Sequence, residues 1–201
     1  MPMVTRCIAL LSLTACGLNV FTVQDDIDLG MQLRDDINSD TKNFNVVARM
    51  DAPAAYAELD RMLDIVLESE DIRFRDEFAW EIHLIDDDKT LNAFAGPGGY
   101  IWIYSGIMRY LKVEDHFVGV LGHEVAHADR RHSTNQLTKA VGLDILLDVV
   151  VGQDRGAISQ VTEGLLGLRF SRDDEAEADD FSVRYLCGTE YAADGAAGFF
   201  Q

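Results

Sequence analysis

The feature that most constrains this chain is an apolar helical segment that carries two histidines and a glutamate. Residues 114–132 read EDHFVGVLGHEVAHADRRH, and within them His123, Glu124 and His127 form an H-E-x-x-H pattern. A spacing of four places both imidazoles on one helix face, about one turn apart, where both can reach one tetrahedral metal ion. The neighbouring positions are apolar, so we expect a buried helix whose polar groups need partners, and a metal can supply them.

Glu124 adds the chemistry that the two histidines lack. It lies beside them, close enough to take a proton from a water that a metal activates. The motif alone is only moderately specific, and the alternative interpretation is a pair of structurally satisfied histidines. Of the other histidines, His132 lies a turn beyond the motif and is expected to be structural, and His116 falls on another face.

An acidic segment further along the chain offers a third metal ligand. Residues 171–179 read SRDDEAEAD, which fits the first turns of a helix. Glu175 can complete a His-His-Glu set that leaves one position open for water. Asp179, one turn further on, can accept a hydrogen bond from the far nitrogen of a ligand histidine. A solvated acidic face is the alternative, and spacing alone does not choose Glu175 over Glu177 or Asp174.

The remaining pattern predicts a mainly helical protein with one small sheet. Periodicity and breakers place helices at residues 25–37, from Pro53 onward, at 114–132, at 141–153 and from Ser171 onward, and strands at 79–85, 91–95 and 100–104. A GPGG turn separates the last two strands. The expected fold class is therefore α+β. The helix at 141–153 is expected either to pack with one wet stripe or to form a mobile lid over the metal site.

The charge of the chain limits its partners. The 17 Lys and Arg residues against 35 Asp and Glu residues give a formal net charge of -18. Phosphate contact needs a basic surface, so a nucleic-acid binder is excluded, and adsorption to anionic lipid by charge alone is disfavoured. No run reaches 18 uninterrupted apolar residues, so no transmembrane helix of normal length is expected.

The N-terminus is predicted to be a lipoprotein signal. A positive region and a short apolar region precede LTAC at residues 13–16, which resembles the bacterial lipobox. This predicts a signal peptide over residues 1–15, a lipidated tether over 16–24 that begins at Cys16, and one domain over 25–201. The alternative is a hydrophobic N-terminus with an incidental cysteine.

The cysteines of the mature chain then reduce to two. Cys16 carries the lipid, so Cys187 has no partner for an intrachain disulfide. It is expected to be buried and inert on a helix, and an intermolecular disulfide is the alternative. Gly17 follows the lipidated cysteine where an aspartate would favour the inner membrane. By resemblance to Gram-negative lipoproteins, this indicates a periplasm-facing protein of the outer membrane.

Three separated blocks resemble the HtpX-like and CAAX-prenyl-protease-like gluzincin metallopeptidases, in particular their periplasmic lipoprotein branch. The blocks are NAFAGPGGYIWIYSGIM at residues 92–108, LGHEVAHADRRHS at 121–133 and FSRDDEAEADDFSVRYL at 170–186. The resemblance implies a zincin-type domain whose small antiparallel sheet places an edge strand beside the active-site helix.

The resemblance also implies a role for each matching residue. One zinc ion per chain would be bound by His123, His127 and Glu175. Glu124 would be the general base, and Asp179 would support a ligand. The family usually continues to a His-Pro-containing loop that this sequence lacks, so either the sequence is a fragment or the protein lacks that element.

The implied activity is a zinc-dependent endopeptidase that degrades misfolded or misassembled envelope proteins. Extended or unfolded polypeptides would add a strand along Asn92, Ala93, Phe94 and Ala95; without the family, a plain hairpin is the preferred interpretation. The alternative function is a chaperone-like assembly factor for outer-membrane proteins that uses the same cleft without cleavage. Further implied partners are the outer-membrane assembly machinery and the membrane, through the N-terminal lipid.

Overall fold

The computed structural model describes residues 21–152 and 156–196, so the predicted signal peptide and Cys16 lie outside the described residues. The elements in chain order are α1 (Val23–Ser39), α2 (Pro53–Leu67), β1 (Glu81–Ile85), β2 (Ala93–Ala95), the 3-10 helix η1 (Pro97–Gly99), β3 (Tyr100–Tyr104), α3 (Ser105–Tyr110), α4 (Glu114–Asp129), α5 (His132–Val141), α6 (Leu143–Val150), α7 (Ala157–Leu166) and α8 (Arg172–Leu186). The mainly helical α+β class is confirmed. None of the described helices is long and apolar enough to cross a membrane.

The sheet is mixed, and the expectation of an antiparallel sheet was wrong. Its strand order is β1-β3-β2, with β1 parallel to β3 and β2 antiparallel to β3. Residues 86–99 leave β1, form β2 on the far side and return, which gives the long connection that a parallel pair requires. Gly98 and Gly99 make the last turn with φ of 72° and 86°, a backbone region that favours glycine. The predicted first strand begins late, at Glu81, because Trp80 has a φ of 48°.

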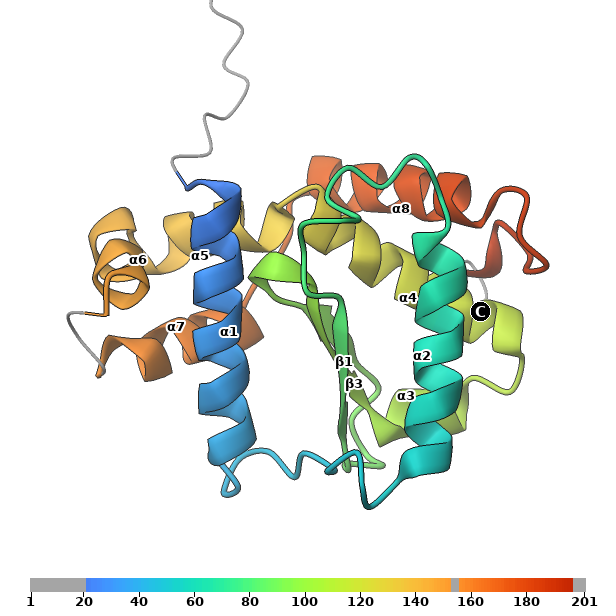
Figure 1. Cartoon of the computed structure of the whole chain (residues 1–201), viewed down its shortest axis with the longest axis horizontal. Helices are drawn as coiled ribbons and strands as arrows, with labels where there is room; N and C mark the ends of the chain where they lie inside the picture. The colour runs from blue at the N-terminus through green and yellow to red at the C-terminus, as the bar shows by residue number, and fades with distance from the viewer. Residues whose placement is uncertain (1–20, 153–155, 197–201) are drawn as a thin grey trace, which may run out of the picture.

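Each face of the sheet has its own core. Ile82, Ile101 and Ile103 pack with apolar residues of α2, α4 and α8, whereas Tyr100 and Trp102 on the opposite face pack with α1 and α5 to α7. Figure 1 shows the sheet standing between α1 and α2, with α4 and α8 passing beside each other at one end. Residues of the edge strand β2 and of the motif helix α4 line the same cleft.

The predicted helix at residues 114–132 is broken in two. α4 ends at Asp129, and α5 begins at His132 after Arg131, which adopts the left-handed conformation with φ 62° and ψ 29°. Left-handed backbone is unusual for arginine, so the sequence carries no glycine or asparagine to signal this break. We call residues 131–134 the α4–α5 corner.

Two smaller expectations had different outcomes. Ser171 is confirmed as the N-cap of α8, because its side chain accepts from the Asp174 backbone N–H while the Asp174 carboxylate accepts from the Ser171 backbone N–H. Cys187 is exposed at the end of α8, so the expectation of a buried cysteine was wrong. The helix terminates at this residue, whereas the preceding Leu186 is buried in the core with residues of α4.

Candidate active site

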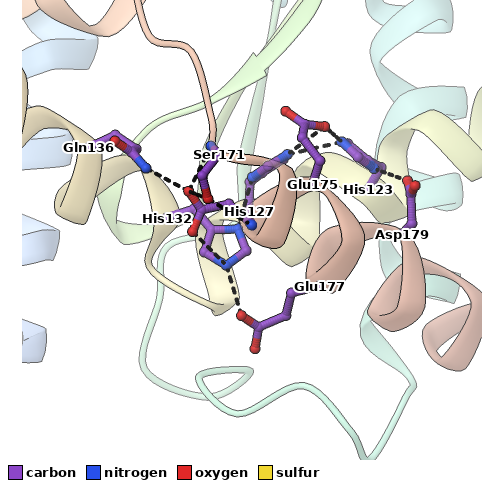
Figure 2. A network of polar contacts seen from close by, with 9 residues as sticks. His123, His127, His132, Gln136, Ser171, Glu175, Glu177 and Asp179 are labelled. Atoms are coloured by element: carbon purple, nitrogen blue, oxygen red, sulfur yellow. Dashed lines mark hydrogen bonds and ion pairs between the residues drawn. The ribbon is translucent and has the colours of Figure 1, made fainter. Parts of the chain in front are cut away.

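The two motif histidines and Glu175 converge at the place where α4 meets α8. The His123 Nε2 and His127 Nε2 atoms are 2.9 Å apart, and a Glu175 carboxylate oxygen lies 3.4 Å from the first and 4.0 Å from the second (Figure 2). Among residues 21–152 and 156–196, these three form the group of histidine, cysteine or acidic side chains that could hold a metal, with donor atoms within 4.8 Å of one another. Two imidazole nitrogens and one carboxylate oxygen suit a divalent ion such as zinc.

The far nitrogen of each motif histidine has its own partner. His123 Nδ1 lies 2.9 Å from Asp179 Oδ1, as the spacing of the acidic segment predicted. His127 Nδ1 lies 3.0 Å from His132 Nδ1, and His132 Nε2 lies 3.2 Å from Glu177 Oε2. Each motif histidine therefore faces Glu175 with its Nε2 atom. Each uses its Nδ1 atom to contact a residue on the other side, Asp179 for His123 and His132 for His127.

The acidic residues that spacing could not rank have separate functions in the structure. Glu175 faces the two motif histidines, whereas Glu177 contacts His132 and accepts a hydrogen bond from Arg130 Nε at 2.8 Å. Asp174 caps α8 and accepts from the Gln136 amide at 2.5 Å. Residues at these spacings point in different directions from one helix, which is why a single acidic run can serve three neighbours.

Buried contacts hold α4 and α8 together and so fix Glu175 opposite the motif. The Ser182 hydroxyl donates to the Gly119 carbonyl at 3.0 Å, and the Tyr185 hydroxyl donates to the Asp129 carboxylate at 2.8 Å. Gly119 also allows a close approach of Ala196, whose backbone nitrogen would lie 2.0 Å from a Cβ at that position. A side chain at Gly119 would therefore push the C-terminal segment away from the motif helix.

Glu124 lies in the same site, and its pKa is raised toward neutral pH. Burial raises the pKa of Glu124 to about 7, with His123 opposing the shift, Glu175 adding to it, and the Ala95 backbone N–H opposing it through a hydrogen bond. Burial, together with the neighbouring histidines, holds the pKa of His127 well below its usual range, so that its imidazole is neutral. A neutral imidazole is the form that binds a metal.

A cleft opens in front of these groups between β2 and the segment that joins α7 to α8. One side is the strand segment 92–95, and the site residues form the floor. The remaining wall is largely apolar and consists of Ile107, Val120, Leu165, Leu166, Leu168 and Phe170. The Phe170 ring stacks on the His127 imidazole with centroids 3.9 Å apart, which shields that side of the ring from water.

The edge strand has fewer open backbone groups than the sequence analysis expected. Asn92 and Gly96 form backbone hydrogen bonds with β3. Along an antiparallel strand the backbone N–H and C=O groups of successive residues point alternately toward and away from the neighbouring strand. The backbone groups of Ala93 and Ala95 therefore point away from the sheet. Ala95 already uses both groups, because its N–H bonds to Glu124 and its carbonyl accepts from Ser133 Oγ at 2.5 Å. Ala93 is therefore the position within β2 whose outward backbone groups face the cleft.

The patterns in the sequence identify the convergent residues, and from them His132 is expected to be structural. Its side chain lies directly behind His127 and is only 3% exposed. The signal for this placement would have been a break between the two helices, and the sequence contains no such breaker. His116 lies on α4 near its N-terminal end and is not among the residues that line the cleft.

Together the geometry defines a site of the metallopeptidase class: an H-E-x-x-H helix, a carboxylate from a second helix and a half-buried glutamate between them. The sequence profile of peptidase family M48 matches residues 53–200, and the chain belongs to that family. The site has the residue types of a metallopeptidase of that family.

Relatives come from both mitochondria and bacteria. The chain is 40% identical over 107 residues to Mitochondrial metalloendopeptidase OMA1 of Schizosaccharomyces pombe, covering 51% of this chain and 31% of that protein. It is 28% identical over 129 residues to Metalloprotease YcaL of Escherichia coli (61% and 49%) and 26% identical over 135 residues to Beta-barrel assembly-enhancing protease of Yersinia pestis (61% and 28%). The matched part thus spans less than half the length of each relative.

Proposed function

We propose that this protein is a zinc-dependent endopeptidase with a zincin-type active site. His123, His127 and Glu175 bind one zinc ion, Glu124 is the general base, and Asp179 orients His123. The observation that carries this proposal is the convergence of the three donor atoms within 4.8 Å, with both histidines held from behind. Histidine and carboxylate ligands with such outer partners are typical of catalytic zinc sites that keep an open position.

Each residue around the site has a separate role in peptide hydrolysis. Zinc, when bound, supplies a Lewis acid that polarises the scissile carbonyl and lowers the pKa of an attacking water toward about 7. Glu124 takes a proton from that water and returns it to the nitrogen of the leaving amine. The Ala95 N–H holds the Glu124 carboxylate in place, and the Phe170 ring limits the access of bulk water to His127.

The substrate enters as an extended polypeptide along β2. Asn92, Ala93, Phe94 and Ala95 line one side of the cleft, and the outward backbone groups of Ala93 are the anchor for an added strand. The apolar opposite wall favours substrates that expose apolar side chains, which is the property that distinguishes unfolded from folded proteins.

The cellular role proposed here is the removal of misfolded or misassembled envelope proteins, by a protein anchored through Cys16 in the bacterial outer membrane. The lipobox-like residues 13–16 support the anchor. The similarity to proteins named YcaL, LoiP and Beta-barrel assembly-enhancing protease supports the envelope. The resemblance to the HtpX-like lipoprotein branch belongs to the same proposal, as does contact with outer-membrane assembly machinery.

The variant Glu124→Gln tests the mechanism. It should bind one zinc per chain as the parent does but lose cleavage of unfolded casein by roughly 10²–10⁴-fold, because the proton acceptor is gone. Glu70→Gln makes the same change on an exposed residue outside the cleft and should leave both properties unchanged. Equal cleavage by Glu124→Gln and the parent would exclude Glu124 as the general base, and a parent without zinc would exclude the metal site itself.

A further inference from the structure

The support of His127 is an unusual one, because an imidazole stands where a carboxylate or carbonyl commonly stands. His132 Nδ1 lies 3.0 Å from His127 Nδ1, and both side chains are nearly fully buried, at 3% and 2% exposure. Glu177 then contacts the other nitrogen of His132 at 3.2 Å (Figure 2). The contacts form one line from His127 through His132 to Glu177, which we call the relay.

Metal binding at Nε2 of His127 would set every hydrogen of the relay. The Nε2 lone pair belongs to the metal, so Nδ1 carries the hydrogen and donates it to His132 Nδ1. His132 must then be neutral with its own hydrogen on Nε2, where it donates to Glu177. The Glu177 carboxylate is placed to accept it, because Oε2 lies 3.2 Å from His132 Nε2 while Oε1 accepts from Arg130 Nε at 2.8 Å.

The break between α4 and α5 is what makes this contact. In an uninterrupted helix, residues five apart lie about 140° apart around the axis, so His132 would point away from His127. The left-handed backbone of Arg131, with φ 62°, redirects the chain and brings His132 behind the motif. This backbone conformation is unfavourable for a residue with a side chain, so the neighbouring contacts must offset it.

Those contacts come from the start of α1. The Arg131 guanidinium pairs with the buried carboxylate of Asp26 and donates to the carbonyls of Phe21 and Thr22 at 2.7 Å and 3.0 Å. The Thr134 hydroxyl donates to Asp26 as well, at 2.9 Å. The α4–α5 corner is therefore held by contacts with the start of α1, and none of these partners is a proposed metal ligand.

We propose that His132 is a positioning residue that fixes the orientation and tautomer of His127 for metal binding, and that Asp26 and Arg131 hold it in place. The inference rests on the zinc site proposed above and extends it by the residue behind the second histidine. A purely space-filling role for His132 is the competing explanation. The space-filling explanation differs from the proposed role in one respect. It does not require an acceptor atom next to His127 Nδ1.

Two substitutions separate these explanations. His132→Leu keeps an apolar side chain of similar volume but removes the acceptor, which leaves a buried His127 N–H without a partner. His132→Asn places a carboxamide oxygen near the former Nδ1 position and keeps the acceptor. The measurement is the zinc dissociation constant of each variant by competition with a chromophoric chelator, together with the thermal unfolding midpoint of the zinc-free protein.

We expect His132→Leu to weaken zinc binding by about 10- to 100-fold and His132→Asn to recover most of that loss. His116→Leu and His116→Asn make the same changes on α4 outside the relay and should leave the zinc affinity as in the parent. If His132→Leu does not fold without metal, Glu177→Gln takes its place as the acceptor-weakening variant, since its side chain is 40% exposed, and should weaken binding by about 10-fold.

Several outcomes would overturn the inference. Zinc binding by His132→Leu as tight as that of the parent would do so, as would equal losses in the Leu and Asn variants or unchanged binding by Glu177→Gln. A parent protein that binds no zinc would instead overturn the proposed function. The d–d absorption of the cobalt-substituted protein gives a second readout, because a reoriented His127 changes the coordination geometry and shifts that band.

Discussion

The two motif histidines lie on one helix face, yet they are supported in contrasting ways. The Nδ1 atom of His123 contacts Asp179, a single carboxylate whose side chain is 59% exposed. The Nδ1 atom of His127 contacts His132, whose side chain is 3% exposed. His132 is itself held by Glu177 and by the α4–α5 corner. Water can replace an exposed acceptor, whereas a buried donor that loses its partner remains unsatisfied. The buried support should therefore matter more, although the exposed one has the stronger, charged acceptor.

Removal of the Glu175 carboxylate, which both motif histidines face, should have the largest effect on zinc affinity. A protein that has lost this ligand no longer allows the two histidine supports to be compared. Glu175→Ala should weaken zinc binding beyond the 10- to 100-fold range typical of losing an outer support. Zinc content after dialysis and the dissociation constant would measure it. Retention of zinc at parental affinity would show that the ligand set is assigned wrongly.

Removal of the exposed support should have an intermediate effect. Asp179→Ala should weaken zinc binding by no more than about 10-fold, the lower end of the range for outer partners, because a water can accept from His123 Nδ1. The same chelator competition, run beside His132→Leu, gives the ratio between the two supports. A loss in Asp179→Ala equal to that in His132→Leu would mean that burial does not decide the strength of a support.

Loss of the ion pair at the outer end of the relay should have the smallest effect. Arg130→Gln removes the pair with Glu177, in which the Arg130 side chain is 17% exposed, but leaves the Glu177 contact to His132. A partly exposed ion pair contributes about 0–1 kcal/mol, so the zinc dissociation constant should rise by at most roughly fivefold. A larger rise would show that the charge of Glu177, more than its hydrogen bond, holds His132.

The sequence predicted those parts of the molecule that local patterns encode. The strand at residues 100–104, the helix that opens at Pro53 and the Ser171 cap follow from periodicity and capping, and the structure has them. The H-E-x-x-H spacing placed His123 and His127 on one face because helix geometry leaves no alternative. Each of these features depends on residues that are close together in the sequence, so the local pattern is enough to predict it.

The parts that sequence could not predict depend on contacts between distant segments. The parallel pairing of β1 with β3 follows from where residues 86–99 cross the sheet, and no residue in either strand signals it. Glu175 differs from Glu177 only in the direction that it faces once α8 is packed on α4. The turn at Arg131 is stabilised by Asp26, more than a hundred positions earlier, so no window of local sequence contains its cause.

The location of Asp26 bears on where a working fragment of this protein has to start. The family profile begins its match at residue 53, after the whole of α1. A shortened protein that followed this limit would keep His123, His127 and Glu175 and still lose the carboxylate that pairs with Arg131. The role proposed for Asp26 therefore places the first helix inside the catalytic unit, upstream of the residue where the family match begins.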